Sequence, residues 1–399
     1  MDIVIIANFC GRLDGESNSR FLELASMLCR DHQVEVITTD FLHGPKQHTE
    51  KPSADYPFPI TLLHESGYPK NVCLKRFASH HEFGKNVGSY LARRKKPDVI
   101  YAAVPSLTAP LAAAKYCRRN GVRFVIDVQD LWPEAFSLVF PVPGIGPLLF
   151  APFRSMADRI YSAADGICAV SRTYADRALS VNRKCREGTV VYLGTRLAEF
   201  DAMRQAAPGL EKADGEVWMG YVGTLGHSYD LTGTLDAMAL LRRQGRGENL
   251  RFLVMGDGPL RAKFEAHAKE LDLPVTFTGM LPYSQMVPQL CACDFAVNPI
   301  MHGAAQSIIN KVGDYAAAGL PVLNTQECPE YRDLVTGYEM GINCENGDVA
   351  QMAEAMARLT EDASLRTRLG AGNRRLAEER FDRAATYRLL SAEILKKAD

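Results

Sequence analysis

Three polar side chains stand close together in residues 303–322, GAAQSIINKVGDYAAAGLPV, a stretch otherwise rich in small apolar residues. An amide at Asn310, a cation at Lys311 and a carboxylate at Asp314 have a spacing that predicts one shared helix face. A helix that begins near Ser307–Asn310 would add its N-terminal N–H groups and dipole to the charge of Lys311, which suits a diphosphate. Asp314, one turn further, could accept hydrogen bonds from a ribose diol. The alternative is a plain Lys–Asp helical pair.

Glycine-bearing loops that follow predicted strands are the second candidate for phosphate binding. These are NFCGRLDGESNS with Gly11, Gly15 and Asn18, GYVGTLGHSYDL with Gly223 and Thr224, and VMGDGP with Gly256, Asp257 and Gly258. Glycine lets the backbone turn tightly, and the N-terminus of the helix that follows can receive an anion. Each loop alone can equally be explained as turn chemistry. No G-x-G-x-x-G fingerprint is present, which disfavours an NAD-dependent dehydrogenase.

Short apolar, β-branched runs alternate with amphipathic helical stretches, and this pattern predicts the elements that position those residues. We expect strands at 3–8, 33–39, 97–104, 122–128, 165–171 and 188–194, then at 217–223, 250–258, 275–281, 294–300 and 320–325. Helical stretches such as 18–31, 230–244 and 261–273 lie between them. Near-continuous apolar strands interleaved with helices predict parallel sheets covered on both faces. The predicted fold class is therefore α/β, with two tandem Rossmann-like doubly wound domains facing a central cleft.

The domain boundaries follow from one break in this alternation. Residues 197–216 are polar and carry Pro208, Gly209 and Gly215, so we interpret them as an interdomain linker. This predicts one domain at 1–196 and a second at 217–380. The helical segment 381–399 is expected to pack back on the first domain.

Composition excludes several classes of function. The 399 residues carry a formal net charge of −1, which argues against a nucleic-acid binder. Ten cysteines lack metal-ligand spacing and are expected to be reduced thiols, as in a cytosolic protein. The opening segment MDIVIIANFCG has no basic region and reads as a buried strand, so we expect no secretion signal.

The motifs YVGTLGHSYDL, VMGDGP, FTGML and NKVGDYAAAGLPV, in this order, resemble the family-four glycosyltransferases with the GT-B fold. The segment VIDVQDLWPEAF is similar to that of bacterial surface-polysaccharide members, as in capsule or O-antigen synthesis. The resemblance covers nearly the whole chain. It implies that the domain at 1–196 binds the acceptor and that the domain at 217–380 binds the nucleotide-sugar. It implies a hexosyl- or glycosyltransferase that moves a sugar from a nucleotide-sugar, such as a UDP-sugar, to an acceptor, with retention of configuration. It implies no metal and no other cofactor.

The resemblance also assigns residues. Donor binding falls on Gly15, Gly223, Thr224, Gly256, Asp257, Gly258, Met280, Leu281, Ser307, Asn310 and Asp314. The catalytic candidates are Asp130, Lys311 and Gln306, and the acceptor candidates are Trp132, Glu134 and Asn18. Asp130 would orient or deprotonate the acceptor hydroxyl, and Trp132 would stack on a sugar. For these two, a turn or helix-cap role and core packing are the alternatives.

Several positions depart from the family pattern. Members carry Glu, seven residues, then Glu, whereas this chain has Gln306 and Asp314. An Arg and a Lys that grip the diphosphate are replaced by Thr224 and Tyr229, so Lys311 is the candidate for the missing charge. Gln129 replaces a frequent His. The loss of charge at 306 keeps a non-catalytic nucleotide-sugar-binding subunit open as an alternative, together with a GT-B sugar-nucleotide epimerase.

Two stretches suggest a lipid-linked saccharide acceptor in bacterial polysaccharide synthesis. Residues 136–153 are apolar but broken by prolines and glycines, and residues 75–96 are basic with interleaved apolar residues. A packed loop and a solvated helix face are the alternatives. We expect a cytoplasmic protein and, as a further hypothesis, peripheral contact with the inner face of the cell membrane.

Overall fold

The computed structural model describes residues 1–14, 19–71, 73–135, 150–304 and 307–396. Gly15, Asn18 and Gln306 lie outside the described residues, as does most of the apolar stretch 136–153. The chain forms two compact units. Unit 1 comprises Met1–Val191 with Tyr387–Asp399, and unit 2 comprises Tyr192–Thr386.

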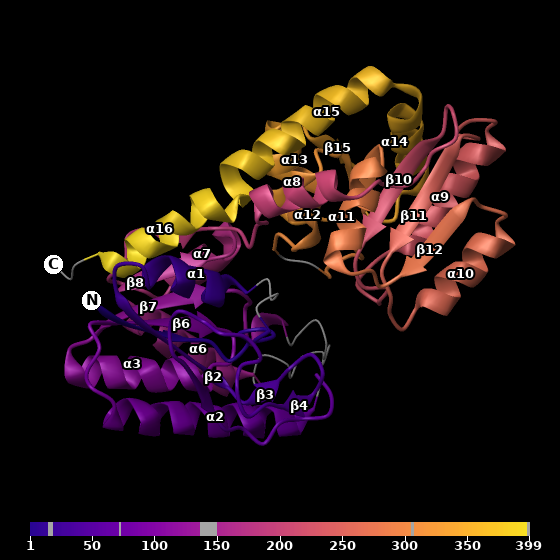
Figure 1. Ribbon diagram of the computed structural model, residues 1–399. Helices are drawn as coiled ribbons and strands as arrows, with labels where there is room; N and C mark the ends of the chain where they lie inside the picture. Colours follow the sequence, from indigo (N-terminus) through magenta and orange to yellow (C-terminus); the bar gives the residue numbers. More distant parts are fainter. Residues whose placement is uncertain (15–18, 72, 136–149, 305–306, 397–399) are drawn as a thin grey trace. The chain divides into compact units, whose positions relative to one another are not determined.

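Unit 1 is built on a seven-stranded parallel sheet in the order β5-β2-β1-β6-β7-β8-β9 (Figure 1). Its inner strands are buried apolar runs, as parallel strands covered on both faces must be, whereas the two edge strands β5 and β9 are half-buried. They are β1 (Asp2–Ile6), β2 (Gln33–Thr39), β5 (Ile60–Leu63), β6 (Val99–Val104), β7 (Arg123–Val128), β8 (Gly166–Ala169) and β9 (Thr189–Val190). A short antiparallel hairpin, β3 (Phe41–Leu42) and β4 (Gln47–His48), follows β2.

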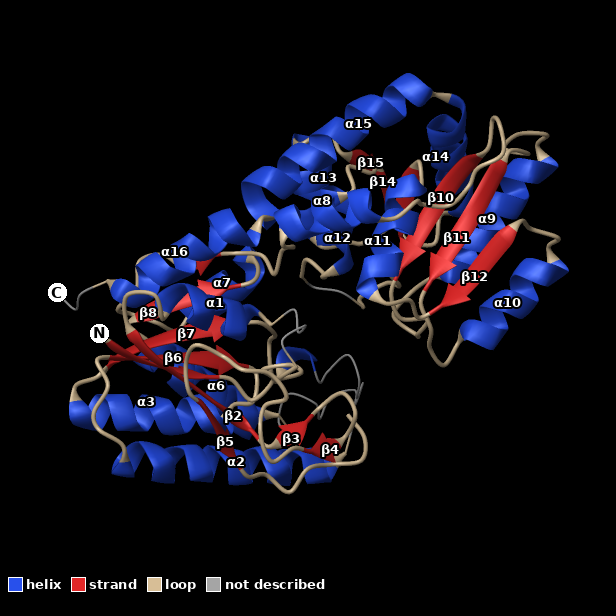
Figure 2. Ribbon diagram, viewed as in Figure 1, coloured by secondary structure: helices blue, strands red, loops and turns tan. Residues whose placement is uncertain are grey.

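The helices of unit 1 cover both faces of this sheet (Figure 2). One core cluster joins strand residues with α1 and with the end of α16 (Arg383–Leu395), and α2 and α3 lie on the opposite face. Helix α1 begins after Ser19, whose hydroxyl accepts a hydrogen bond from the Leu22 N–H. The helices are α1 (Arg20–Leu28), α2 (Leu74–Arg93), α3 (Thr108–Asn120), α6 (Ala151–Ala163) and α7 (Arg172–Leu179).

A buried ion pair fixes α1 to the sheet of unit 1. The Arg20 guanidinium donates to both carboxylate oxygens of Asp127 on β7, at 2.7 and 3.0 Å, and to the carbonyl oxygen of Val191 at 2.8 Å. Both side chains are almost fully buried. Removing either partner would leave an uncompensated buried charge.

Unit 2 holds a six-stranded parallel sheet in the order β12-β11-β10-β13-β14-β15. The strands are β10 (Val217–Val222), β11 (Leu250–Met255), β12 (Val275–Gly279), β13 (Phe295–Asn298), β14 (Val322–Asn324) and β15 (Gly341–Asn343). The helices are α8 (Leu197–Ala206), α9 (Leu231–Arg243), α10 (Arg261–Glu270), α11 (Tyr283–Ala292), α12 (Lys311–Ala317), α13 (Pro329–Gly337), α14 (Val349–Glu361), α15 (Ala363–Leu376) and the π-helical η1 (Ala377–Phe381). Helix α16 (Arg383–Leu395) begins in unit 2 and continues into unit 1 from Tyr387. The predicted fold class of two Rossmann-like α/β halves is confirmed.

The segment interpreted as a linker differs from that prediction. Residues 197–206 form helix α8, which packs on α11 within unit 2, and Asp201 pairs with Arg374 at 2.6 Å. The boundary therefore falls between Val191 and Tyr192 rather than at residue 196. The polar surface of α8 caused the error, because one exposed helix face resembles a linker in composition. From Tyr387 onward the chain belongs to unit 1.

Candidate functional site

Two glycine-bearing loops of unit 2 meet at the carboxyl ends of β10 and β11. The Leu225 N–H donates to the Asp257 carbonyl at 2.9 Å, and the Leu260 N–H donates to the Leu225 carbonyl at 2.9 Å. A Cβ placed on Gly256 would lie 1.8 Å from the Gly223 carbonyl oxygen, and one on Gly258 would lie 2.5 Å from the Leu225 carbonyl oxygen. Glycine is therefore needed at these two positions because the backbones of the two loops touch. Turn geometry alone would not require it.

The ammonium of Lys311 lies directly beside this pair of loops. Its Nζ is 3.9 Å from the ring centroids of both Tyr221 and Tyr229, which meet edge to face. A Cβ on Gly223 would lie 2.9 Å from the same Nζ. The Tyr221 hydroxyl donates to the Thr224 carbonyl at 2.8 Å, so one ring of this tyrosine cage also holds the loop. Aromatic faces attract a cation without neutralising it.

The Lys311 ammonium is buried and lacks a hydrogen-bond partner among the described residues. The side chain is 8% exposed, and no described group accepts from Nζ. Burial lowers the pKa of Lys311 well below its usual value. Among the described contacts, Lys311 and Asp314 form no ion pair, so the alternative of a Lys–Asp helical pair is not found. A buried ammonium without an acceptor is costly, and an anionic ligand would relieve that cost.

Asp314 points to a different set of groups. Its Oδ1 accepts from the Tyr283 hydroxyl at 2.7 Å and from the Thr195 hydroxyl at 3.2 Å. Oδ2 accepts no hydrogen bond from the described residues. Burial raises the pKa of Asp314, while the bonds from Tyr283 and Thr195 act in the opposite direction. The structure thus places Lys311 and Asp314 on α12 in separate environments, and Asn310 is exposed just before the helix.

The other predicted donor residues lie on the loops of unit 2. Thr224 and Asp257 are exposed, and Asp257 accepts from the Gly258 N–H at 2.7 Å. Met280, just after β12, is 80% exposed, and Leu281 follows it half-buried. The Ser307 carbonyl accepts from the Gln326 amide at 2.6 Å, which ties the segment before α12 to the end of β14.

The sequence analysis did not identify the residues that surround the Lys311 ammonium and the Asp314 carboxylate. Tyr221 and Tyr229 form the cage around Lys311, and Tyr229 was noted only as a departure from a family lysine. Tyr283 and Thr195 position Asp314. Tyr221 lies inside a strand and Tyr229 in the loop that follows it. No periodic pattern links the two positions, so the sequence did not indicate that their rings meet.

A pocket of about 420 Å³ opens at the carboxyl ends of β1, β2 and β7 in unit 1, and it contains Asp130 and Trp132. The Asp130 carboxylate accepts from the Leu131 N–H at 2.9 Å and from the Trp132 indole at 3.2 Å, and burial raises the pKa of Asp130. The Trp132 ring is 6% exposed and is stacked on His80 with centroids 5.7 Å apart. Trp132 thus has a packing role and also lines the pocket.

The same pocket contains a cation surrounded by aromatic rings. The Arg76 guanidinium carbon lies 4.6, 5.4 and 5.6 Å from the ring centroids of Trp132, Phe9 and Tyr68. Its Nε is buried without a partner among the described residues, and one terminal nitrogen donates to the Asn71 carbonyl at 2.9 Å. Burial, helped by Lys46 and Arg76, lowers the pKa of His43 in this pocket to about 4. The local field is therefore positive.

Glu134 is held within unit 1. Its carboxylate accepts from Arg177 at 2.6 Å, and Arg177 also donates to Asp158 at 2.7 Å. Gly15, Asn18 and Gln306 lie outside the described residues, so their assigned roles stay predictions. No helix that the structure describes is long and apolar enough to cross a membrane.

Comparisons with known proteins agree with this architecture of two Rossmann-like units, which is the GT-B arrangement of glycosyltransferases. The family described as glycosyl transferases group 1 matches residues 216–362, and the glycosyl transferase 4-like domain matches residues 15–194. Together the two matches cover most of the chain. The chain is therefore similar to glycosyltransferases in both of its units.

Individual relatives are distant. The 2-deoxystreptamine glucosyltransferase of Streptomyces kanamyceticus is 31% identical over 174 residues, which are 43% of this chain and 43% of that protein. Anabaena HepE in complex with UDP superposes with a TM-score of 0.68 at 16% identity, covering 98% of this chain and 99% of that one. WaaG, a glycosyltransferase of lipopolysaccharide biosynthesis, superposes with a TM-score of 0.65 at 16% identity, covering 99% and 100%.

Proposed function

We propose that this protein is a glycosyltransferase that moves a sugar from a nucleotide-sugar donor to a lipid-linked saccharide acceptor in bacterial glycan synthesis. The observation that carries the proposal is the buried, unpartnered ammonium of Lys311 at the glycine loops of unit 2. A cation in that position matches the diphosphate of a nucleotide-sugar. The similarity of both units to glycosyltransferase families supports the same reaction class.

In this proposal the donor binds in unit 2, with its diphosphate on Lys311 and the loops at Gly223 and Gly256. The Asp314 Oδ2, which no described residue occupies, accepts from the ribose diol. The exposed residues Thr224, Met280 and Asn310 lie on the surrounding surface. UDP is the first candidate for the nucleotide, because solved structures of Anabaena HepE contain UDP and UDP-glucose.

The proposed chemistry is departure of the nucleoside diphosphate from a sugar that gains oxocarbenium character. Lys311 stabilises the charge that develops on the leaving diphosphate, and this interaction strengthens in the transition state. Gln306 hydrogen-bonds the sugar hydroxyls, although an amide cannot stabilise positive charge at the anomeric carbon as a carboxylate would. We propose retention of configuration through front-face displacement, without a metal.

The acceptor is proposed to bind in the pocket of unit 1. Asp130 orients or deprotonates the attacking hydroxyl, because its burial makes the carboxylate a stronger base than a solvated one. Arg76, which has no carboxylate partner among the described residues, receives the phosphate of a lipid-linked saccharide. The Trp132 edge borders the sugar. This arrangement supports an acceptor that carries both sugar and negative charge.

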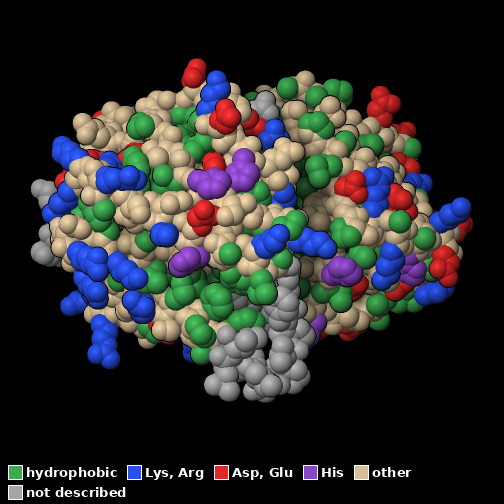
Figure 3. All heavy atoms as spheres, turned by 90° about the horizontal axis from the view of Figure 1, so that it is seen from below, with side chains coloured by type: hydrophobic (Ala, Val, Ile, Leu, Met, Phe, Trp, Pro, Cys, Tyr) green, Lys and Arg blue, Asp and Glu red, His purple; other side chains and the backbone are tan. Residues whose placement is uncertain are grey.

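We also propose peripheral membrane contact through α2. Leu74 at its start is 86% exposed and stands beside the exposed Lys75, with Lys85 and Arg93 further along the helix. Figure 3, seen from the side on which α2 lies, shows Lys and Arg side chains gathered over that part of unit 1. Most of the apolar stretch 136–153 lies outside the described residues.

Liposome sedimentation tests this contact. The protein should sediment with anionic liposomes at low salt, more weakly at high salt, and less after the double change Lys75→Glu and Lys85→Glu. Absence of binding to anionic liposomes at low salt would refute membrane contact and leave the donor site untouched.

The function itself is tested by thermal-shift screening of a nucleotide-sugar panel, followed by a turnover assay with the donor that binds. A transferase releases nucleoside diphosphate, slowly by hydrolysis without acceptor and faster with it. Donor binding without any release would favour the non-catalytic binding subunit that the amide at Gln306 suggests. Interconversion of the donor alone would identify an epimerase instead.

A further inference from the structure

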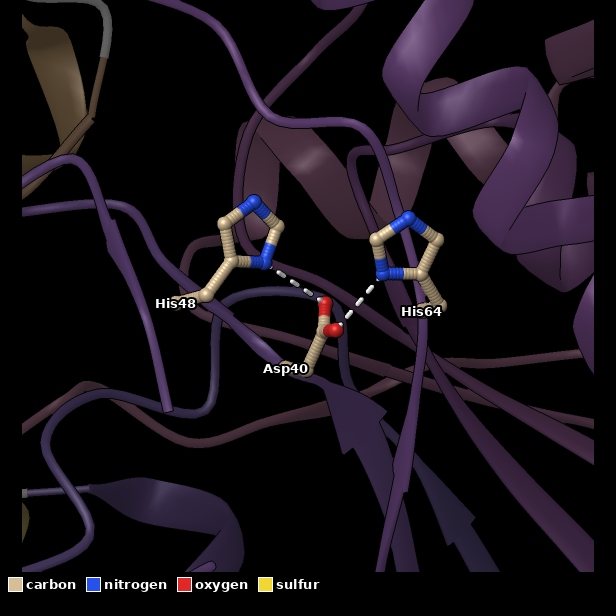
Figure 4. Close-up of side chains that lie close together, drawn as sticks. All are labelled: Asp40, His48 and His64. Atoms are coloured by element: carbon tan, nitrogen blue, oxygen red, sulfur yellow. Dashed lines mark hydrogen bonds and ion pairs between the residues drawn. The ribbon is translucent and has the colours of Figure 1, made fainter. Parts of the chain in front are cut away.

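Three side chains from separate segments of unit 1 converge at its surface (Figure 4). Asp40 follows β2, His48 is the last residue of β4, and His64 follows β5. Figure 4 shows both imidazoles turned toward the same carboxylate. The Asp40 Oδ1 is 3.2 Å from the His48 Nδ1, and Oδ2 is 2.7 Å from the His64 Nδ1.

The backbone holds these three residues in place before any ligand arrives. The Asp40 N–H donates to the Leu63 carbonyl at 3.0 Å, and the Thr49 N–H donates to the Asp40 carbonyl at 2.8 Å. The two imidazole rings are stacked, with centroids 5.5 Å apart and an angle of 24° between their planes. One ligand atom from each residue lies within 4.8 Å of the other two.

We propose that Asp40, His48 and His64 form a binding site for a divalent transition-metal ion of the zinc type. Two imidazole nitrogens and one carboxylate oxygen are a ligand set that zinc uses, with water in the fourth position. Ligands about 2.1 Å from a tetrahedral zinc lie about 3.4 Å apart. The two Asp40–histidine spacings of 3.2 and 2.7 Å, one to each carboxylate oxygen, would have to open by less than an ångström, and the ligand atoms of the two histidines lie within 4.8 Å of each other. Magnesium and calcium prefer oxygen ligands throughout and are not expected here.

The surroundings of the site favour a cation. The Asp40 carboxylate faces both imidazole rings and supplies the negative charge of the site. The hydrogen bond from the Glu65 N–H to the Asp40 Oδ1, at 3.2 Å, also fixes the orientation of the carboxylate. Metal binding requires only that each neutral imidazole carry its proton on Nε2, leaving Nδ1 for the metal.

A metal at this position would tie the β3–β4 hairpin to the ends of β2 and β5. The tip of that hairpin, residues 41–45, lines the 420 Å³ pocket that contains Asp130. The site is therefore structural, and it would fix one wall of the proposed acceptor pocket. It is separate from the transfer chemistry proposed above, which uses no metal, and the inference does not depend on that function.

Cobalt(II) and zinc(II) titrations of the full chain test this site. We expect one cobalt ion per chain with d–d absorption of a tetrahedral nitrogen and oxygen site. The sulfur-to-metal charge-transfer band of a thiolate site should be absent, which distinguishes this site from the ten cysteines. His48→Gln and His64→Gln should each weaken zinc binding by at least about tenfold, the loss seen even for outer-shell changes. His81→Gln, an exposed histidine on α2, is the matched control and should bind as the unchanged chain does.

Hydrogen exchange gives a second readout that does not depend on affinity. Zinc should slow exchange of amides in residues 41–49 in the unchanged chain and in His81→Gln, and should have no such effect in His48→Gln. The proposal is overturned if no ion binds, if a thiolate band accounts for the bound cobalt, or if the two ligand variants bind zinc as well as the control.

Discussion

Gly256 offers a direct test of how the two glycine loops of unit 2 meet. In Gly256→Ala, the new methyl group would lie 1.8 Å from the Gly223 carbonyl oxygen, whereas Cβ atoms do not approach other heavy atoms within 3.0 Å. The loops must therefore separate by more than an ångström. Overpacking of this kind costs about 1–3 kcal/mol. For a domain the size of unit 2, this corresponds to a melting temperature lower by about 2–12 °C.

The same displacement should reach the donor site, because a Cβ placed on Gly223 would lie only 2.9 Å from the Lys311 Nζ, so this loop runs next to the ammonium. We therefore expect Gly256→Ala to bind UDP at least about tenfold more weakly, as a single misplaced charged contact would cause. Differential scanning fluorimetry and isothermal titration calorimetry measure the two effects. Gly337→Ala is the control, since nothing lies within 4 Å of its added methyl group and it belongs to the same unit. If both variants keep wild-type melting and UDP affinity, the close approach of the loops is wrong.

Three further predictions concern unit 1. Asp130→Asn should lower kcat for sugar transfer by at least about a hundredfold, because the general base is lost. The affinity for UDP should stay unchanged. A variant that turns over as fast as the unchanged chain would exclude Asp130 as the base. Asp127→Asn should lower the free energy of unfolding by about 3–5 kcal/mol in urea titration, because the Arg20 charge loses its buried partner, and a loss below about 1 kcal/mol would contradict this. Burial and the positive charge nearby lower the pKa of His80 to about 3. Below about pH 6.5, and until the pH nears that value, the unfolded chain binds a proton at His80 and the folded chain does not. The free energy of unfolding should therefore decrease as the pH is lowered, by up to about 1.4 kcal/mol per pH unit. His80→Phe, which preserves a ring beside Trp132, should flatten that loss between about pH 6.5 and pH 5, and an unchanged slope would contradict the assignment.

Most of the sheet architecture could be predicted because its strands are apolar on both faces. The segments around β1 and β6 read as strands without reference to anything else, since parallel strands under helices need no alternation. The hairpin β3–β4 has strands of two residues each, too short for any periodic signal, and β15 has three. Helix α8 was missed because its exposed residues and the prolines and glycines after it resemble a linker.

The site was predictable as a set of residue types and only partly as an arrangement. Lys311 and the glycine loops follow from motif and strand order, because parallel strands bring their carboxyl ends to one edge. The contact of the Tyr221 and Tyr229 rings with Lys311 could not be predicted, because it depends on ring orientations that no sequence pattern indicates. Asp314 was expected beside Lys311 on one face, but it turns to Tyr283 and Thr195, because the two side chains leave the short α12 in different directions.

The central claim is that Lys311 receives the diphosphate of the donor, and titrating UDP against uridine tests it most directly. Both ligands share the base and ribose, so their difference isolates the phosphate contacts. Calorimetry of the unchanged chain and of Lys311→Met should show UDP weakened by roughly 10- to 150-fold in the variant, the value of one or two charged hydrogen bonds. Uridine should bind both proteins equally. Unchanged UDP affinity in Lys311→Met, or equal weakening of uridine, would contradict the account.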